Sequence, residues 1–261
     1  MVQFYDEIPP FLINWIKTQH VFWVATAPLS ADGHVNLSGK GINGTFHVVN
    51  NRQIWYEDLT GSGCETISHI RENGRITIYF NAFEGPPRIA RLFGKGKVYE
   101  FGTLEYNELV PPEERQPGSR SIIMVDVHKV ATSCGYGIPF FEFKSQRTKY
   151  TDVALKKEAQ DCVSPSSELP SDGLKAYWKK MNSTSLDGLP GMELLPVTVA
   201  TQFIPKAKAS KPKALSKFPK VSVALDERLM FGFALGVLTV LVGGQLNSLG
   251  SLRNVGQFFR G

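Results

Sequence analysis

Seven short runs of β-forming residues constrain the fold of this chain more than any other feature of its sequence. Each run is rich in Val, Ile, Phe, Tyr and Thr, and Gly, Asn or Pro residues separate it from the next. The predicted strands are residues 21–27, 34–38, 46–49, 53–57, 75–81, 90–100 and 121–127. One convincing helix, residues 64–73, interrupts them and is closed by Gly74. Many closely spaced strands with few helices favour a barrel over a doubly wound α/β sheet.

Further helices are predicted only at the edges of this β-rich region. Asp6 can cap a short helix whose first turn carries Pro9 and Pro10, and residues 173–181 have a helical pattern. The polar stretch 156–172 contains Pro and Ser and is predicted to be a loop on the surface. The expected fold class is therefore mainly β (α+β), with a few peripheral helices.

The net charge of +5 comes from the C-terminal end of the chain. From Phe203 onward, six Lys and three Arg stand against Asp226 and Glu227, so this part carries +7 and leaves −2 for residues 1–202. Nucleic-acid affinity rests largely on neutralising phosphates, so we expect no nucleic-acid partner for the folded region.

The cysteines and histidines indicate an intracellular protein without a metal site. There are three cysteines, no CxxC pair, and no basic-then-apolar pattern at the N-terminus, which indicates reduced thiols. The five histidines are scattered and lack the spacing of metal ligands.

The end of the chain divides into three parts. Residues 203–228 are a basic linker of Lys, Pro and Ala, and residues 229–246 are an apolar run near the ~20 residues that cross a bilayer. Lysines precede this run, so a transmembrane tail helix would keep the preceding domain in the cytoplasm, with residues 247–261 as a short tail. The alternative is an amphipathic or buried terminal helix.

A Gly-rich turn between a strand and a helix is the first candidate binding segment. In residues 55–66 a strand ends, Gly61 and Gly63 follow, and a helix begins. Ser62 and Glu65 have the spacing of a capping box, and a helix start of this kind is a good seat for a phosphate. Thr60 and Thr66 add hydroxyl groups. The alternative is a well-capped turn without a ligand.

Two further segments supply cations. Ser38, Gly39 and Lys40 end a predicted strand in a glycine-rich setting, where a ligand can approach the backbone. Arg88 and Arg91 open a later strand after a double proline, and guanidinium groups suit a phosphate or the carbonyl edge of a flavin. A solvated lysine and two surface arginines remain the alternative.

The linked order of these segments resembles the pyridoxamine 5′-phosphate oxidase-like family of FMN-binding split β-barrels over roughly residues 10–145. Residues 133–139 and 182–190 are similar to a fungal-type branch of pyridoxamine phosphate oxidase family proteins. The resemblance implies a homodimer with FMN at its interface. It places FMN contacts at nine positions: Ser38, Gly39, Lys40, Thr60, Ser62, Glu65, Thr66, Arg88 and Arg91.

The sequence departs from the oxidase pattern at its basic positions. Ser38 stands where the oxidase has an Arg, and Glu65 and Thr66 stand where it has an Arg-Lys pair. The resemblance therefore implies an FMN-binding flavoprotein, an oxidoreductase with an unidentified small-molecule substrate, more than the namesake reaction. No catalytic side chain is assigned, because the flavin carries the electrons. The alternative is a non-catalytic FMN-binding or ligand-sensing module tethered to a membrane.

Overall fold

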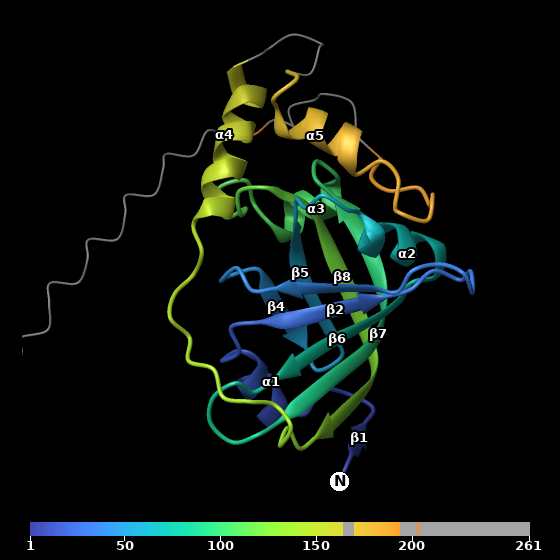
Figure 1. Cartoon of the computed structure of the whole chain (residues 1–261), viewed down its shortest axis with the longest axis vertical. Helices are drawn as coiled ribbons and strands as arrows, with labels where there is room; N and C mark the ends of the chain where they lie inside the picture. The colour runs from blue at the N-terminus through green and yellow to red at the C-terminus, as the bar shows by residue number, and fades with distance from the viewer. Residues whose placement is uncertain (164–169, 194–202, 204–261) are drawn as a thin grey trace, which may run out of the picture. The chain divides into compact units, whose positions relative to one another are not determined.

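The computed structural model describes residues 1–163, 170–193 and 203 (Figure 1). The chain divides into two compact units, Met1–Lys208 and Ala209–Gly261, and only the first contains described residues. The predicted linker and the apolar run 229–246 lie outside the described residues, so the tail helix stays a prediction. Within the described part of the chain, no helix is long and apolar enough to span a membrane.

Antiparallel strands make up most of the described fold, as the sequence predicts. The strands are β1 (Gln3–Tyr5), β2 (Phe22–Thr26), β3 (Asn36–Lys40), β4 (Phe46–Asn50), β5 (Gln53–Leu59), β6 (Arg75–Asn81), β7 (Ile89–Glu100) and β8 (Ser119–Ser133). They form one sheet in the order β3-β2-β6-β7-β8-β5-β4, with β1 paired to β8. Lys40 on β3 contacts Asp58 on β5, so the sheet curls until its two ends approach each other.

The interior of the curled sheet is filled by alternate residues of the strands. On β2, Phe22 and Val24 are buried while Trp23 between them is half-buried, which is the period-two pattern of a strand with one inner face. Phe22 contacts Phe46 and Phe80 in an aromatic cluster that joins β2, β4 and β6. Burial of such rings is the main source of stability for a sheet of this kind.

Close contacts between β7 and its neighbours require glycine at Gly94. The register between β7 and β8 shifts between Phe93 and Gly94, and a side chain at Gly94 would collide with Val125 and with the carbonyl of Asp126. The bulge lets the two long strands bend around the core, since an extra residue increases the local twist.

The helices lie around the sheet (Figure 1). They are α1 (Pro10–Ile16), α2 (Glu65–Asn73), α3 (Leu104–Leu109), α4 (Lys149–Val163) and α5 (Leu174–Met181). Helices α3, α4 and α5 gather at one end of the sheet and α1 lies toward the other. Helix α2 packs its buried Ile67 and Ile70 against the sheet and ends at Gly74, whose φ of 73° is the left-handed C-cap that the sequence predicts.

Three expectations about helix ends and loops are wrong. Helix α1 begins after Pro9, whose side chain makes no cap, and not after Asp6. Helix α2 has Cys64 at its N-cap and no side-chain cap, so the predicted capping box of Ser62 and Glu65 does not form. The first part of the stretch predicted as a surface loop, residues 156–163, belongs to α4, which ends at Val163. Helix α3 and strand β1 were not predicted.

Candidate functional site

A cavity of about 690 Å³ opens between β3, the end of β5 and the start of α4, and we call it the Lys40 cavity. Ser38, Gly39, Lys40 and Thr60 line it, so the structure brings together four of the nine predicted site residues. Ser38 and Lys40 share the inner face of β3, because their partners in the register are the buried Val24 and Phe22 of β2. The cavity is thus built on the inner face of the edge strand.

A buried carboxylate sets the charge beside this cavity. Lys40 Nζ donates a hydrogen bond to Asp58 Oδ1 at 3.0 Å, and Arg120 Nε donates to Asp58 Oδ2 at 2.9 Å. Burial alone would raise the pKa of the Asp58 carboxyl, but the adjacent Arg120 and Lys40 outweigh it and lower that pKa. The carboxylate therefore stays ionised, and the three groups together carry one net positive charge.

The turn before α2 is covered by the chain itself. Asn182 Nδ2 donates to the carbonyl oxygens of Gly61 at 3.0 Å and Gly63 at 3.4 Å. The Glu65 carboxylate lies against Gly63 and accepts the backbone N–H of Leu186 at 3.3 Å. The start of α2 thus carries a carboxylate of its own, while Ser62 is exposed on the turn.

Thr60 connects this turn to two other elements. Its hydroxyl donates to the carbonyl oxygen of Gly118 at 2.6 Å and accepts the indole N–H of Trp178 at 2.7 Å. A hydroxyl has one hydrogen to donate, so Thr60 has none left for a phosphate in this arrangement. Thr60 shapes the wall of the Lys40 cavity as an anchored residue.

Thr66 lies apart from the cavity, at the junction of α2 and β3. It is buried, and Asn36 Nδ2 donates to its hydroxyl at 2.9 Å and to Thr26 Oγ1 at 3.1 Å. Thr26 in turn bonds His69 Nδ1 at 3.0 Å, and burial lowers the pKa of this histidine. This polar network ties α2 to β2 and β3.

Arg88 and Arg91 do not line the Lys40 cavity. The Arg88 guanidinium stacks on Phe11 at 5.3 Å and on Trp15 at 5.6 Å, both on α1. Arg91 lies over Tyr79 at 5.3 Å. The register pairs Arg91 with Tyr79, and Tyr79 with the half-buried Trp23, so Arg91 lies on the outer face of the sheet.

One wall of the Lys40 cavity is formed by an extended segment before α4. The sequence did not predict that this segment is part of the site. The Lys40 cavity is lined by Phe143, Ser145, Gln146 and Arg147 of this segment and by Tyr150 at the start of α4. Residues 134–148 have no regular secondary structure and run along the side of the sheet to α4 (Figure 1). No periodic pattern marks such a segment, so only the fold could place it here.

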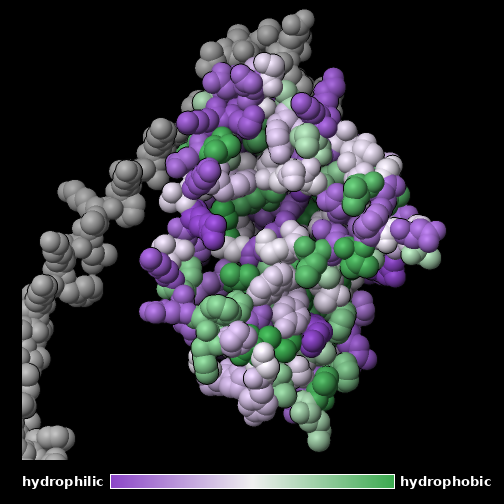
Figure 2. Space-filling model, in the orientation of Figure 1, coloured by the Kyte–Doolittle hydropathy of each residue, from purple (hydrophilic) through white to green (hydrophobic). Residues whose placement is uncertain are grey.

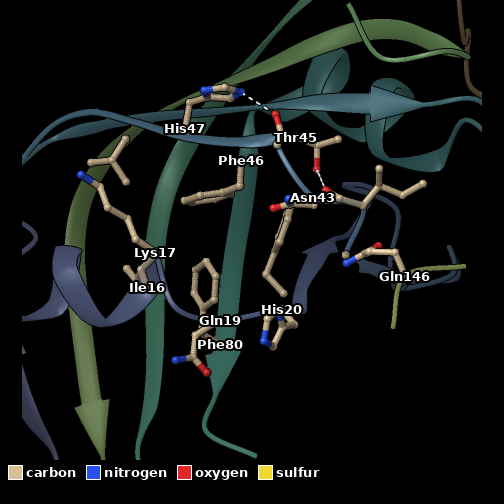
Figure 3. A pocket seen from close by; sticks show the side chains of 15 residues that line it. Ile16, Lys17, Gln19, His20, Asn43, Thr45, Phe46, His47, Phe80 and Gln146 are labelled. Carbon is tan, nitrogen blue, oxygen red and sulfur yellow. Dashed lines mark hydrogen bonds between the residues drawn. The ribbon is translucent and has the colours of Figure 1, made fainter. Parts of the chain in front are cut away.

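A smaller cavity of about 400 Å³ adjoins the Lys40 cavity, and we call it the Phe46 cavity. His20, Gly41 and Gln146 line both. Figure 3 shows His20 and Gln146, which are far apart in the sequence, along this cavity together with Phe46 and Phe80. Burial lowers the pKa of His47 at its edge, whose Nε2 lies 2.9 Å from the Gly44 carbonyl oxygen.

Among the described residues, no group of three or more His, Cys, Asp or Glu side chains could hold a metal ion. The charged residues that line the Lys40 cavity are Lys40, Arg147 and Glu57, and Asp58 lies behind Lys40.

The fold and the site together define a mainly antiparallel β domain with a cavity beside its edge strand. The chain is 36% identical over 198 residues to the pyridoxamine 5′-phosphate oxidase family protein ustO of Aspergillus flavus, covering 72% of this chain and 77% of that protein. The chain belongs to the pyridoxamine 5′-phosphate oxidase family. No protein-family model matches it.

Comparison with solved structures gives lower similarities. A variant of HupZ from Group A Streptococcus aligns with a TM-score of 0.40 and 20% identity, over 48% of this chain and 99% of that one. The FAD binding protein from Mycobacterium smegmatis aligns with a TM-score of 0.34 and 11% identity, over 49% of this chain and 97% of that one.

Proposed function

We propose that this chain binds FMN in the Lys40 cavity and acts as an FMN-dependent oxidoreductase on a small molecule. The observation that carries the proposal is the cavity itself, which collects Ser38, Gly39, Lys40 and Thr60 in a member of the pyridoxamine 5′-phosphate oxidase family. Its volume of about 690 Å³ falls in the range of cofactor sites.

The residues of the cavity fit a flavin phosphate at its cationic end. An ammonium group has three hydrogens, and among the described residues Lys40 uses one of them on Asp58. Exposed Arg147 lines the same cavity and adds a guanidinium group. A side chain at Gly61 would meet no atom within 4 Å, so the backbone there is open to a ligand. Lys40, Arg147 and the Gly61 backbone would hold the phosphate.

FMN, when bound, supplies hydride or electron transfer through its isoalloxazine ring. The chain contributes binding and orientation: Asp58 and Arg120 fix the position of Lys40, and Phe143 with Tyr150 covers the cavity on the α4 side. Burial raises the pKa of Tyr150, so this phenol stays protonated and can only donate its hydrogen or accept one. We assign no catalytic residue.

Titration of the full-length protein with FMN tests the proposal. We expect a yellow protein, or uptake of FMN at micromolar concentration by a colourless one. Replacing Lys40→Met removes the ammonium and should weaken FMN affinity about tenfold or more, because a hydrogen bond to a charged group contributes ~1.5–3 kcal/mol.

The matched control is Lys97→Met. Lys97 also pairs with an aspartate, Asp126, at 3.2 Å, but it is exposed on β7 away from the cavity. Its replacement should leave FMN affinity unchanged. Absence of FMN uptake by the wild type, or equal losses in the two variants, would rule out this site.

A non-catalytic FMN-binding or ligand-sensing module tethered to a membrane is the second candidate function. Two observations favour its ligand-sensing form: Lys40 is already paired with Asp58, and Thr60 has no free hydrogen for a phosphate, so the cavity also suits a ligand without a phosphate. A flavin-loaded protein that neither a nicotinamide cofactor nor a substrate reduces would support this module over the enzyme. Carbonate extraction of cell membranes tests the tether, and release of the protein into the supernatant would exclude a spanning tail.

We further propose a homodimer in which Arg88 and Arg91 serve the partner's cavity. Within one protomer these two arginines lie outside the Lys40 cavity, and Arg91 is on the outer face of the sheet. If a second copy of the chain packed on that face, Arg91 of one protomer could contact the flavin in the cavity of the other. This arrangement agrees with the family resemblance, which implies FMN at a dimer interface.

A further inference from the structure

Next to the Lys40 cavity lies a second cavity that the proposed flavin site does not use. It has a volume of about 510 Å³, and we call it the Trp15 cavity. His20, Val21 and Phe143 line both cavities. The rings of His20 and Phe143 stack with centroids 3.8 Å apart and planes 12° apart, so this pair forms a shared partition.

Aromatic rings from three segments make the walls of the Trp15 cavity. Trp15 comes from α1, Phe83 follows β6, and Phe141 and Phe143 come from the extended segment before α4. The backbone N–H of Phe141 donates to the carbonyl oxygen of Phe83 at 3.1 Å, and their rings meet edge to face at 5.2 Å. The N–H of Phe143 donates to Glu84 Oε1 at 2.8 Å. These bonds hold the walls in place without a ligand.

The charges around the two cavities are opposite. Among the described residues, the lining of the Trp15 cavity contains two carboxylates, Glu84 and Glu142, and no Lys or Arg. The lining of the Lys40 cavity contains Lys40, Arg147 and one carboxylate, Glu57, so its formal charge is positive. The faces of aromatic rings attract cations through their negative quadrupole, and carboxylates at the rim add to that attraction. The Arg88 guanidinium already lies over the Trp15 ring, so Phe83 and Phe141 are the rings that would attract a ligand cation.

A buried polar group adds a further feature to the Trp15 cavity. Asn81 lines it and is 4% exposed, and its Nδ2 has no hydrogen-bond partner in the described part of the chain. A buried donor without a partner is costly, so an acceptor atom on a ligand would gain by reaching it.

We propose that the Trp15 cavity binds a small organic cation, an amine or quaternary ammonium with an aromatic body. The aromatic walls take the body, the rings with Glu84 and Glu142 favour the positive charge, and phosphorylated or carboxylated ligands are disfavoured. The Asn81 amide takes an acceptor atom where the ligand has one. This site needs no flavin, so the proposal is independent of the proposed function.

Isothermal titration of the full chain, without flavin, tests the proposal with three probes of similar shape. We expect benzyltrimethylammonium to bind, benzyl alcohol to bind more weakly, and benzoate to bind at least about tenfold more weakly than the cation. Phe141→Ala should weaken binding of the cation about fivefold, since one aromatic wall is lost. Phe141 is 59% exposed, so this change should leave the fold intact.

Phe140→Ala is the matched control. Phe140 is the adjacent residue, is 80% exposed and does not line the cavity. The Phe140→Ala variant should bind the cation as the wild type does. Glu84→Gln keeps an acceptor for the Phe143 N–H but removes a negative charge, so it should weaken binding of the cation about twofold to fivefold. Benzoate binding as tightly as the cation, no cation binding at millimolar concentration, or equal effects of Phe140→Ala and Phe141→Ala would each overturn the proposal.

Discussion

At the scale of single residues, two cations converge on Asp58 beside the Lys40 cavity. Replacing Asp58→Asn leaves Lys40 and Arg120 close together without their shared carboxylate. Because Asp58 and Arg120 are almost fully buried, we expect a loss of ~3–5 kcal/mol in the free energy of unfolding, measured by urea denaturation. Asp126→Asn is the control, because the side chains of Asp126 and its partner Lys97 are 45% and 61% exposed, and that pair should contribute less than about 1 kcal/mol.

The same carboxylate predicts a dependence of stability on pH. The neighbouring Arg120 and Lys40 hold the pKa of Asp58 in the folded protein below the usual value of an aspartate, ~3.9, so its ionised form stabilises the fold above that value. This stabilisation is lost as the pH falls through the lowered pKa of the folded state. The difference in unfolding free energy between the wild type and Asp58→Asn should therefore be largest near neutral pH and shrink below about pH 4. A difference that grows on acidification would contradict this assignment.

At the scale of elements, the segment after α5 holds the turn that precedes α2. Asn182 is fully buried and bridges the Gly61 and Gly63 carbonyl oxygens. Asn182→Ala should cost ~1 kcal/mol in unfolding free energy, because the Gly61 carbonyl oxygen loses its side-chain donor, whereas the Gly63 carbonyl oxygen keeps the Arg120 guanidinium as a donor. It should also weaken FMN binding, since the backbone at Gly61 would no longer be fixed beside the cavity.

Ser183→Ala is the neighbouring control, because the Ser183 side chain is exposed. Chemical denaturation and FMN titration of both variants measure the two effects. If Asn182→Ala lowers stability but leaves FMN affinity unchanged, the turn is not part of the flavin site.

The strands could be predicted from sequence because their signal is local. On β2 and β6 the β-branched and aromatic residues alternate in burial, as a sheet with one inner face requires. The helix α2 was predicted within one residue, but its cap was not, because Ser62 and Glu65 have the spacing of a capping box while long-range contacts decide the cap. Cys64 packs against Gly191, and the Glu65 carboxylate is engaged by the Leu186 N–H.

The candidate site was predictable only where its residues follow one another. Ser38, Gly39 and Lys40 lie together on β3, so they reach the cavity as a group. The hydrogen-bond partners of these residues could not be predicted, because they are distant in the sequence. Asp58 pairs with Lys40, and Trp178 donates to the Thr60 hydroxyl across 118 positions. Arg147 lies in a segment without a periodic pattern, and Tyr150 follows that segment. Both line the cavity only because of the path that the segment takes in the fold.

At the scale of the whole molecule, exposed apolar residues lie around the edge strand β3. Leu29, Val35 and Leu37 are 64%, 74% and 68% exposed. In Figure 2 the hydrophobic residues of the visible face lie in groups among hydrophilic ones. Single apolar residues are normal on a surface, so this exposure alone does not decide how two copies would pack. Light scattering of the full chain should give about twice the protomer mass of 29.0 kDa if the proposed homodimer forms.

A complementation experiment tests whether two copies share each flavin site. In a symmetric dimer whose sites combine Lys40 of one protomer with Arg91 of the other, Lys40→Met and Arg91→Ala each damage both sites. A mixed dimer of the two variants has one doubly damaged site and one intact site. Random mixing makes about half of the dimers mixed, so about a quarter of the wild-type FMN sites should return with wild-type affinity. If both residues serve the same protomer's cavity, mixing restores no site, and FMN titration of co-expressed variants separates the two arrangements.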